Sequence, residues 1–248
     1  MRGYGEHYFS LFVVAFGIVA VGSIYIRYLQ DYIYGAFSFC AADILLLCWL
    51  PFYRCIIIVP CILSYILFLN HYDFNINRAI RYRDMRRVWK EQILKNSFYM
   101  MVLSFLITAG IVLIHLGSVE EWVNFDDRSS LFAFMNDGQM ITDPPFIKII
   151  LVFWCCMFIY IELHTIFFQF LWWVTNNRMI TFLIVFIWST AESYTMKISL
   201  VFNRIGVGYD RWIHKDFGIG GTILTILIIA AVGIKAADRK EVLNAEKQ

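Results

Sequence analysis

The sequence predicts an all-α membrane protein with six transmembrane helices and both termini in the cytoplasm. Of its 248 residues, 60% are hydrophobic and only 16% are charged, and several apolar runs are uninterrupted. Soluble domains average about 45–50% apolar and about 25% charged residues. A helix needs roughly 20 apolar residues to cross a hydrocarbon core of about 30 Å, and several of the runs reach that length. The whole chain, 1–248, is expected to form one transmembrane domain.

Six spans are predicted, at about 9–26, 44–69, 97–116, 147–171, 179–200 and 217–235. The first run is too long for a signal peptide and no small-residue cleavage site follows it, so we expect it to be retained. The second span contains Pro51 and Pro60, and each proline removes a backbone hydrogen bond and favours a kink. Short polar connections separate the spans, except for a longer loop over 117–146.

The distribution of charge assigns sides, because cytoplasmic loops carry an excess of Lys and Arg. The connection after span two is strongly basic, which places it inside, and with six spans both termini are then inside as well. The loop over 117–146 is acidic and is expected outside. The basic connection holds Arg78, Arg81, Arg83, Arg86, Arg87, Lys90 and Lys95, and the acidic loop holds Glu120, Glu121, Asp126, Asp127, Asp137 and Asp143 against Arg128.

The connection over 202–216 should lie outside, yet it mixes charged with apolar residues. Gly206 and Gly208 disfavour a continuous helix there. Phe202, Ile205 and Trp212 are among its apolar residues and indicate contact with the membrane interface. We expect a short, irregular re-entrant or interfacial segment.

The basic connection itself has a helical pattern. Ala79, Tyr82, Met85, Trp89 and Ile93 recur at intervals of three and four residues, with Arg and Lys between them. This predicts a basic amphipathic helix over about 77–95 that runs directly into span three. One interpretation is an anchor on anionic headgroups, which attract each nearby basic residue by about 1 kcal/mol. The other is a docking site for a cytoplasmic partner.

Polar residues inside the predicted spans form a second set of candidates. Arg54 lies about a dozen residues into span two, and an arginine at that depth is costly unless it reaches the surface or finds a partner. Glu162 and Glu192 are its candidate partners. The polar stripes on spans three, four and five are explained either by hydrogen bonds between helices or by a polar translocation path. The candidates are Arg54, Glu162, Gln169, Glu192, Ser104 and Thr108.

Signatures of catalysis or of a metal site are absent from the sequence. There is no H-E-x-x-H, no G-x-S-x-G and no G-x-x-x-x-G-K-[ST], so the chain alone is not expected to hydrolyse ATP. His164 is two residues from Glu162 and therefore about 200° around the helix, so the two do not share a face. The six cysteines show no C-x-x-C spacing. We therefore expect no enzyme, no metal, no cofactor and no nucleic-acid partner.

Three short motifs resemble the membrane subunits of ABC-2 type transporters. The closer similarity is to the small permeases of Gram-positive peptide exporters and lantibiotic-type immunity systems. Arg81-Tyr82-Arg83-Asp84-Met85-Arg86-Arg87-Val88-Trp89-Lys90 resembles the segment that leads into their span three. Gln169 to Arg178, with the sequence QFLWWVTNNR, resembles their connection between spans four and five, and Gly233 to Lys240 resembles their last span and basic tail.

The resemblance implies a permease of the type V exporter-like arrangement in the bacterial cytoplasmic membrane, with several passes. A separate ATPase subunit, which would carry ATP and Mg, is implied to dock on Arg81, Arg83, Arg86, Arg87, Trp89 and Lys90. Two permease chains, identical or paralogous, would export an amphipathic peptide or a lipid-like molecule. Two alternatives stay open: a stand-alone membrane protein that binds a peptide and confers immunity, and an ion-coupled transporter that uses Glu162 or Glu192.

Overall fold

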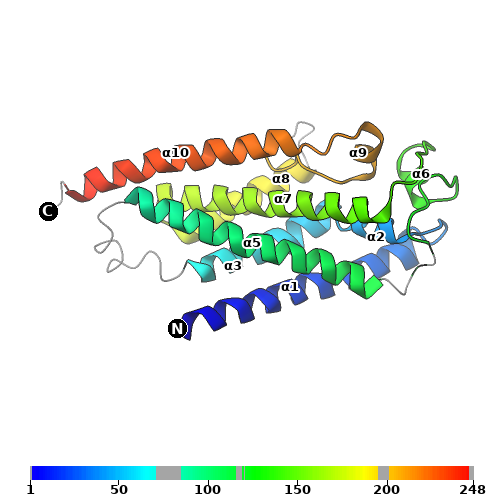
Figure 1. Cartoon of the computed structure of the whole chain (residues 1–248), viewed down its shortest axis with the longest axis horizontal. Helices are drawn as coiled ribbons and strands as arrows, with labels where there is room; N and C mark the ends of the chain where they lie inside the picture. Colours follow the sequence, from blue (N-terminus) through cyan, green and yellow to red (C-terminus); the bar gives the residue numbers. More distant parts are fainter. Residues whose placement is uncertain (1, 71–84, 116–118, 120, 195–200, 246–248) are drawn as a thin grey trace.

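A computed structural model describes residues 2–70, 85–115, 119, 121–194 and 201–245 (Figure 1). Long helices dominate this part of the chain and lie roughly side by side. They are α1 (Arg2–Tyr28), which the π-helical turn η1 (Leu29–Ile33) extends, α5 (Met85–His115), α7 (Phe146–Thr175), α8 (Arg178–Tyr194) and α10 (Ile219–Ala245).

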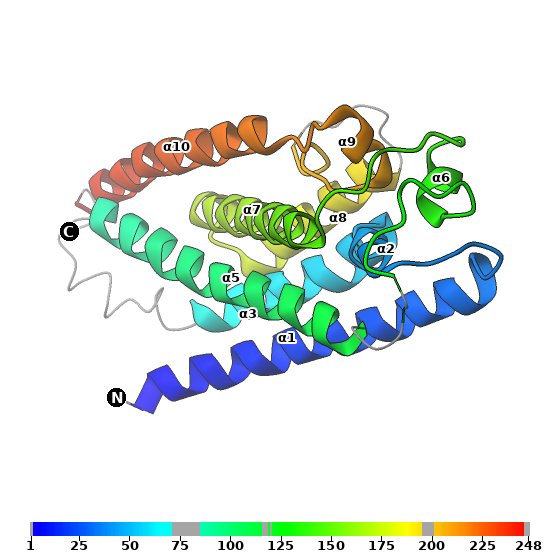
Figure 2. The same cartoon turned by 45° about the vertical axis from the view of Figure 1, so that its right-hand side comes forward.

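Helix α7 runs through the middle of the bundle and packs against α5, α10, α8 and α3 (Val59–Leu69). The view in Figure 2 shows α5, α8 and α10 around it, with α1 outside α5 and α3. Because α7 has neighbours on several sides, side chains on its different faces enter different interfaces. Both candidate sites described below depend on this central position.

The predicted class, an all-α membrane protein, is supported at the coarse level. Four helical segments are long and apolar enough to cross a membrane: Glu6–Ile33, Met85–His115, Phe146–Thr175 and Ile219–Ala237. Large apolar side chains point outward from them, for example Phe9, Phe16 and Ile24 of α1, which are 73%, 74% and 71% exposed. Exposed apolar surface of this extent is expected to face lipid. Six crossings and their sidedness remain predictions.

Span two is broken more severely than the predicted kinks suggested. It consists of α2 (Ala41–Leu47), a turn, the π-helical segment η2 (Tyr53–Ile58) and α3. Pro51 follows the turn, where a missing N–H costs nothing because the first residues of a helix have no partner for it. The π-helical turns precede Pro60, which cannot donate to the carbonyl one turn back. Arg54 lies on η2, a widened type of turn that often occurs at functional sites.

The two ends of the bundle differ. Both chain termini and the beginning of α5 lie at one end, at the left of Figure 1. The short helices α6 (Leu131–Met135) and α9 (Tyr209–His214) lie at the other end, together with the beginning of α2. The beginning of α5 with its basic turn and the acidic residues of the loop after α5 therefore lie at opposite ends of the bundle, and which end faces the cytoplasm stays a prediction.

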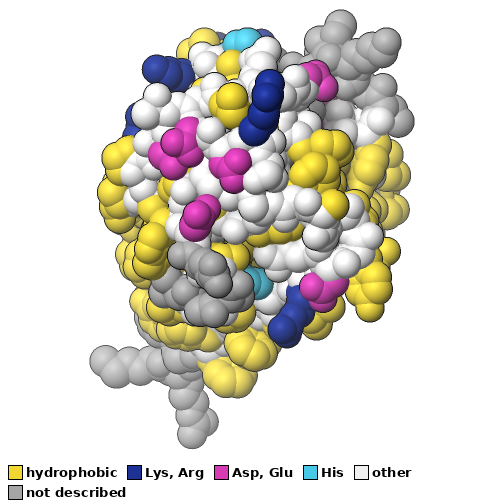
Figure 3. All heavy atoms as spheres, turned by 90° about the vertical axis from the view of Figure 1, so that its right-hand side faces the viewer, with side chains coloured by type: hydrophobic (Ala, Val, Ile, Leu, Met, Phe, Trp, Pro, Cys, Tyr) yellow, Lys and Arg dark blue, Asp and Glu magenta, His cyan; other side chains and the backbone are white. Residues whose placement is uncertain are grey.

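The acidic loop forms part of a folded cap, which we define as residues 34–43, 121–145 and 201–218. Single β-bridges join Ser38 to Ser130 and Cys40 to Glu121. Phe125 stacks on Phe132 with ring centroids 4.1 Å apart. Acidic side chains are visible on this end of the molecule (Figure 3).

The segment over 202–216 belongs to this cap. It is irregular apart from α9, as predicted. Its apolar side chains, however, are buried in protein: Phe202, Ile205 and Trp212 are at most 4% exposed, and Trp212 packs on Phe125. Packing inside the cap accounts for the apolar character of these three residues, and contact of the segment with the membrane interface stays a prediction.

Candidate functional site: two buried polar clusters beside the central helix

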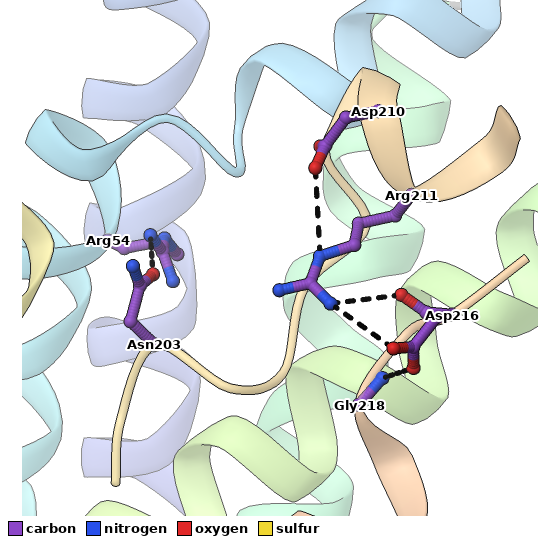
Figure 4. A network of polar contacts seen from close by, with 6 residues as sticks. All are labelled: Arg54, Asn203, Asp210, Arg211, Asp216 and Gly218. Atoms are coloured by element: carbon purple, nitrogen blue, oxygen red, sulfur yellow. Dashed lines mark hydrogen bonds and ion pairs between the residues drawn. The ribbon is translucent and has the colours of Figure 1, made fainter. Parts of the chain in front are cut away.

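Arg54 is almost completely buried, with 4% of its surface exposed. Its Nη2 donates a hydrogen bond to Oδ1 of Asn203 at 3.0 Å (Figure 4). Its guanidinium carbon lies 5.3 Å from the ring centroid of Trp49 and 5.5 Å from that of Tyr160. Cations within about 6 Å of an aromatic face are stabilised by the ring quadrupole. Two rings and one amide oxygen therefore surround this charge.

Glu192 of α8 is fully buried and accepts hydrogen bonds on both carboxylate oxygens. The indole N–H of Trp188 donates to Oε1 at 2.7 Å. The backbone N–H groups of Val201, Phe202 and Asn203 donate to the carboxylate at 2.7–3.1 Å. Successive backbone N–H groups that point to one side form an anion-binding concavity. This carboxylate is thus held as an acceptor, and it ties α8 to the start of the cap.

The expected ion pair between Arg54 and Glu162 or Glu192 is not formed in the described part of the chain. Asn203 stands between Arg54 and Glu192, because it accepts from the arginine with its side chain and donates to the glutamate with its backbone. Glu162 lies on the face of α7 turned to α5 and bonds to Ser97. We name the group of Arg54, Glu192, Asn203, His164 and Ser189 the outer polar cluster.

His164 completes the outer polar cluster from α7. Its Nδ1 lies 2.9 Å from the backbone oxygen of Tyr160, and its Nε2 lies 2.9 Å from Oγ of Ser189. Since a carbonyl only accepts, Nδ1 carries the hydrogen, and Nε2 of the neutral ring accepts from the Ser189 hydroxyl. The ring stacks on Phe202 with centroids 4.2 Å apart. His164 is therefore a bridge between α7, α8 and the cap segment, and its ring nitrogens are both occupied.

A second set of polar side chains lies between α5 and α7. The amide of Asn96 donates to Oε1 of Gln169 at 3.1 Å, and the amide of Gln169 donates to Oε1 of Gln92 at 3.0 Å. The indole N–H of Trp173 also donates to Oε1 of Gln92 at 3.0 Å. Ser97 follows Asn96 and donates to Glu162. We name the residues Gln92, Asn96, Ser97, Glu162, Gln169 and Trp173 the α5–α7 seam.

Ser104 and Thr108 continue along α5 but do not belong to this seam. The hydroxyl of Ser104 donates to the backbone oxygen of Met101 at 2.8 Å, and that of Thr108 to the oxygen of Ser104 at 2.9 Å. Both side chains are buried and bonded within their own helix. Such bonds let a helix carry hydroxyl groups through an apolar interface without a partner on another helix. Neither hydroxyl bonds to another helix among the described residues, and a role of these two residues on a polar path stays a prediction.

The basic turn at the beginning of α5 presents Arg86, Arg87 and Lys90 to the surface. Arg87 pairs with Glu91 at 2.8 Å, one turn along the helix. An exposed pair of this kind contributes only about 0.3–0.5 kcal/mol, so it is easily exchanged for another partner. Arg81 and Arg83, the other two basic residues proposed for docking, lie outside the described residues.

Trp89 has a different position from the one expected of a docking residue. It is fully buried, its indole N–H donates to the backbone oxygen of Ala230 at 3.1 Å, and its ring meets Trp173 edge to face at 5.4 Å. A Cβ atom on Gly233 would overlap its indole ring. Trp89 thus joins α5 to α7 and α10 and is not accessible to a partner, which corrects its assignment as a docking residue.

Sequence reasoning found Arg54, Glu162, Gln169 and Glu192 but missed the residues that connect them. Asn203, Trp49 and Tyr160 were not singled out, because Asn203 is 149 residues from Arg54 in the chain and no local pattern marks it. No three His, Cys, Asp or Glu side chains in the described ranges gather as metal ligands would. Searches of family models, of curated proteins and of solved structures find no match to this chain.

Proposed function

We propose that the chain is the membrane-spanning, non-catalytic subunit of an ATP-driven ABC exporter. In this proposal the chain crosses the bacterial cytoplasmic membrane six times, with the basic end of the bundle inside and the cap outside. A separate ATPase subunit supplies ATP hydrolysis and docks on the basic turn of α5. Two such chains, identical or paralogous, enclose the path of an amphipathic peptide or lipid-like substrate.

One observation carries the proposal: the basic turn and the third apolar span are a single helix of 31 residues. Arg86, Arg87 and Lys90 are exposed at its beginning, while Trp89 between them is locked against α7 and α10. A force applied to this turn would therefore reach three helices that run the length of the bundle. An anchor that only rests on lipid headgroups has no need of such a connection.

The same arrangement supports the two remaining crossings of the proposal. The sequence of α2, η2 and α3 leads from the cap end back to the basic end, and α8 leads from the basic end toward the cap. The described part of α8 has 17 residues, and its predicted span continues into 195–200, which lies outside the described residues. The acidic side chains of the cap fit an outside location, because excess positive charge marks the cytoplasmic side.

The proposal is tested by purifying the tagged chain from its native host in mild detergent and identifying co-purified proteins by mass spectrometry. We expect an ATPase with a G-x-x-x-x-G-K-[ST] motif at a one-to-one ratio, and we expect Arg86→Gln with Arg87→Gln to reduce its recovery at least tenfold. The matched control is Arg204→Gln with Lys215→Gln, which removes two exposed positive charges at the opposite end.

Recovery of the chain without any ATPase, under conditions that preserve a known ABC complex, would overturn the proposal and favour a stand-alone peptide-binding protein. An equal loss of ATPase in the control variant would show a general charge effect instead of docking on α5.

A further inference from the structure

The donors and acceptors of the α5–α7 seam have a fixed direction. The indole of Trp173 can only donate, so the atom of Gln92 that faces it must be the carbonyl oxygen. Gln169 also bonds to this oxygen and must do so with its amide N–H, which turns its own oxygen toward Asn96. Asn96 then donates to Gln169 with its amide N–H. The orientation of all three amides follows from the single donor-only group at one end of the row.

The other end of the seam consequently presents acceptors. Oδ1 of Asn96 is buried and meets no donor among the described residues. Ser97 donates its one hydroxyl hydrogen to Oε1 of Glu162. Oε2 of Glu162 is also buried and without a donor in the described part of the chain, and the residue is only 6% exposed. Two buried oxygens therefore have no hydrogen-bond donor among the described residues, at the place where α5 meets the middle of α7.

No positive side chain that the structure describes compensates Glu162. In α5, which contributes Ser97, Lys95 donates to the backbone oxygen of Leu69, and His115 and the basic turn lie toward its two ends. In α7, His164 is bonded to Tyr160 and Ser189.

The other elements packed on α7 also bring no positive side chain to Glu162 within the described residues. Helix α3 carries no charged residue, and Arg54 of η2 is bonded to Asn203. In α8, Arg178 lies over the Trp172 ring at the beginning of the helix, and Glu192 is held by backbone N–H groups. Asp43 of α2 accepts from Cys40, and Lys235 is the charged residue of α10 whose side chain is described.

The two buried glutamates thus differ in a way that decides their chemistry. Glu192 receives N–H donors on both oxygens, which suits an ionised carboxylate that only accepts. Glu162 receives one hydroxyl donor on one oxygen. An isolated ionised carboxylate in an apolar interior is so unfavourable that the group is neutralised instead. A hydrogen on Oε2 would remove this charge.

We propose that Glu162 is a proton-binding site in the middle of the bundle, which holds a proton on Oε2 while Ser97 occupies Oε1. The proton comes from the hydronium ion of the solvent: one of its O–H bonds breaks and leaves water, while an O–H bond forms at Oε2 and converts the carboxylate to the neutral acid. Because Ser97 is on α5, a displacement of α5 along α7 removes the one donor to Glu162 and changes its proton affinity. Proton binding is thereby coupled to the position of α5, whatever drives that helix, and the inference does not depend on an ATPase partner.

The test is infrared spectroscopy of the purified full chain in phosphatidylcholine vesicles at pH 7. A protonated carboxyl group absorbs separately from a carboxylate, and its band shifts when H₂O is exchanged for D₂O. We expect such a band in the unsubstituted protein, its loss in Glu162→Gln, and its retention in the matched variant Glu192→Gln. We also expect Ser97→Ala to shift the band to higher frequency, because the carbonyl then loses its hydrogen bond.

Two results would overturn the proposal: no protonated carboxyl band at pH 7, or a band that survives in Glu162→Gln. Circular dichroism checks that each variant keeps its helix content. If Glu162→Gln fails to fold, Ser97→Ala decides, because a band unchanged by the loss of the Ser97 hydroxyl does not belong to Glu162.

Discussion

Asn203 connects Arg54 to Glu192 without any direct contact between the two charges. Its side-chain oxygen accepts from the arginine at 3.0 Å, and its backbone N–H donates to Oε2 of the glutamate at 3.1 Å. Arg54 comes from the π-helical part of span two, and Glu192 from the helix before the cap segment. One uncharged residue therefore links the interior of the bundle to the structure that covers its end.

Replacing Asn203 by leucine is expected to destabilise the protein by about 1–3 kcal/mol, because a buried charged donor loses its acceptor. The backbone bond to Glu192 is retained in this variant, so the loss reports on Arg54. The measurement is the free energy of unfolding in mixed micelles, for Asn203→Leu, Arg54→Leu and the double variant. We expect a coupling energy of about 0.5–3 kcal/mol, as for residues in contact. Strictly additive effects would show that the hydrogen bond contributes nothing.

Replacing Glu192 by glutamine is expected to reduce the stability of the protein much more than replacing Glu162 by glutamine. In Glu192→Gln an amide NH₂ would face backbone N–H groups, leaving buried donors without an acceptor, at a cost of at least about 2 kcal/mol. In Glu162→Gln the carbonyl oxygen can still accept from Ser97, and we expect a loss below about 1 kcal/mol. Thermal unfolding of the two variants in the same detergent measures the difference. A reversed order would contradict the donor arrangement described for both residues.

Alanine at position 233 is expected to loosen the packing of α10 on α5. The added Cβ overlaps the Trp89 indole, and overpacking of a buried contact costs about 1–3 kcal/mol. Gly220→Ala is the control on the same helix, because its Cβ would meet no atom within 4 Å. For Gly220→Ala we expect the free energy of unfolding to stay the same or to rise by up to about 1 kcal/mol, because alanine has the higher helix propensity.

The free energies of unfolding of the two alanine variants provide the comparison. Combining Gly233→Ala with Trp89→Phe, which removes part of the bulky ring, should recover some of the loss. Equal effects at both glycines would mean that the close approach of Trp89 to α10 is not maintained in the membrane.

The extent to which sequence alone predicted this arrangement depends on the range of the interactions involved. Apolar runs correctly located the long helices, because span length and hydrophobicity are local properties. The described part of the apolar stripe, Met85, Trp89 and Ile93, correctly indicated one face of a helix, while 77–84 lie outside the described residues. A stripe, however, does not identify what covers that face. Its partners Ala230 and Trp173 are far away in the chain. Trp89 was therefore assigned to a docking surface when it belongs to the interior.

For the polar sites, too, the sequence identified the residues but not their partners. Charged residues inside apolar runs are conspicuous in a sequence, and Arg54, Glu162 and Glu192 were found for that reason. Opposite charges suggested a pair, yet the arginine contacts Asn203 and two aromatic rings, and Glu192 accepts from backbone N–H groups. Backbone groups carry no signature in a sequence, so the actual partner of Glu192 could only be found from the fold.

The cap should lose local stability in acid through Asp127. The backbone N–H and the hydroxyl of Ser129 donate to this exposed carboxylate at 2.9 and 2.7 Å and hold its pKa below the usual 3.8. A carboxyl group whose pKa is lowered by folding stabilises the fold above its unfolded pKa, and this contribution is lost as the pH falls through the folded value. The effect is therefore complete at neutral pH and disappears below about pH 4.

Amide hydrogen exchange over 121–135, corrected for intrinsic exchange rates, measures this contribution. At pH 7 we expect Asp127→Asn to exchange faster than the unsubstituted protein around Ser129, and at pH 3 we expect the difference to shrink. Asp137→Asn is the matched control in the same cap, at a residue with a positive φ of 53° that asparagine tolerates. It should leave exchange around Ser129 unchanged. Suppose instead that the two proteins differ in exchange by as much at pH 3 as at pH 7. That result would show that the carboxylate charge does not stabilise this turn, because only the charged form of Asp127 differs from asparagine in its bonds to Ser129.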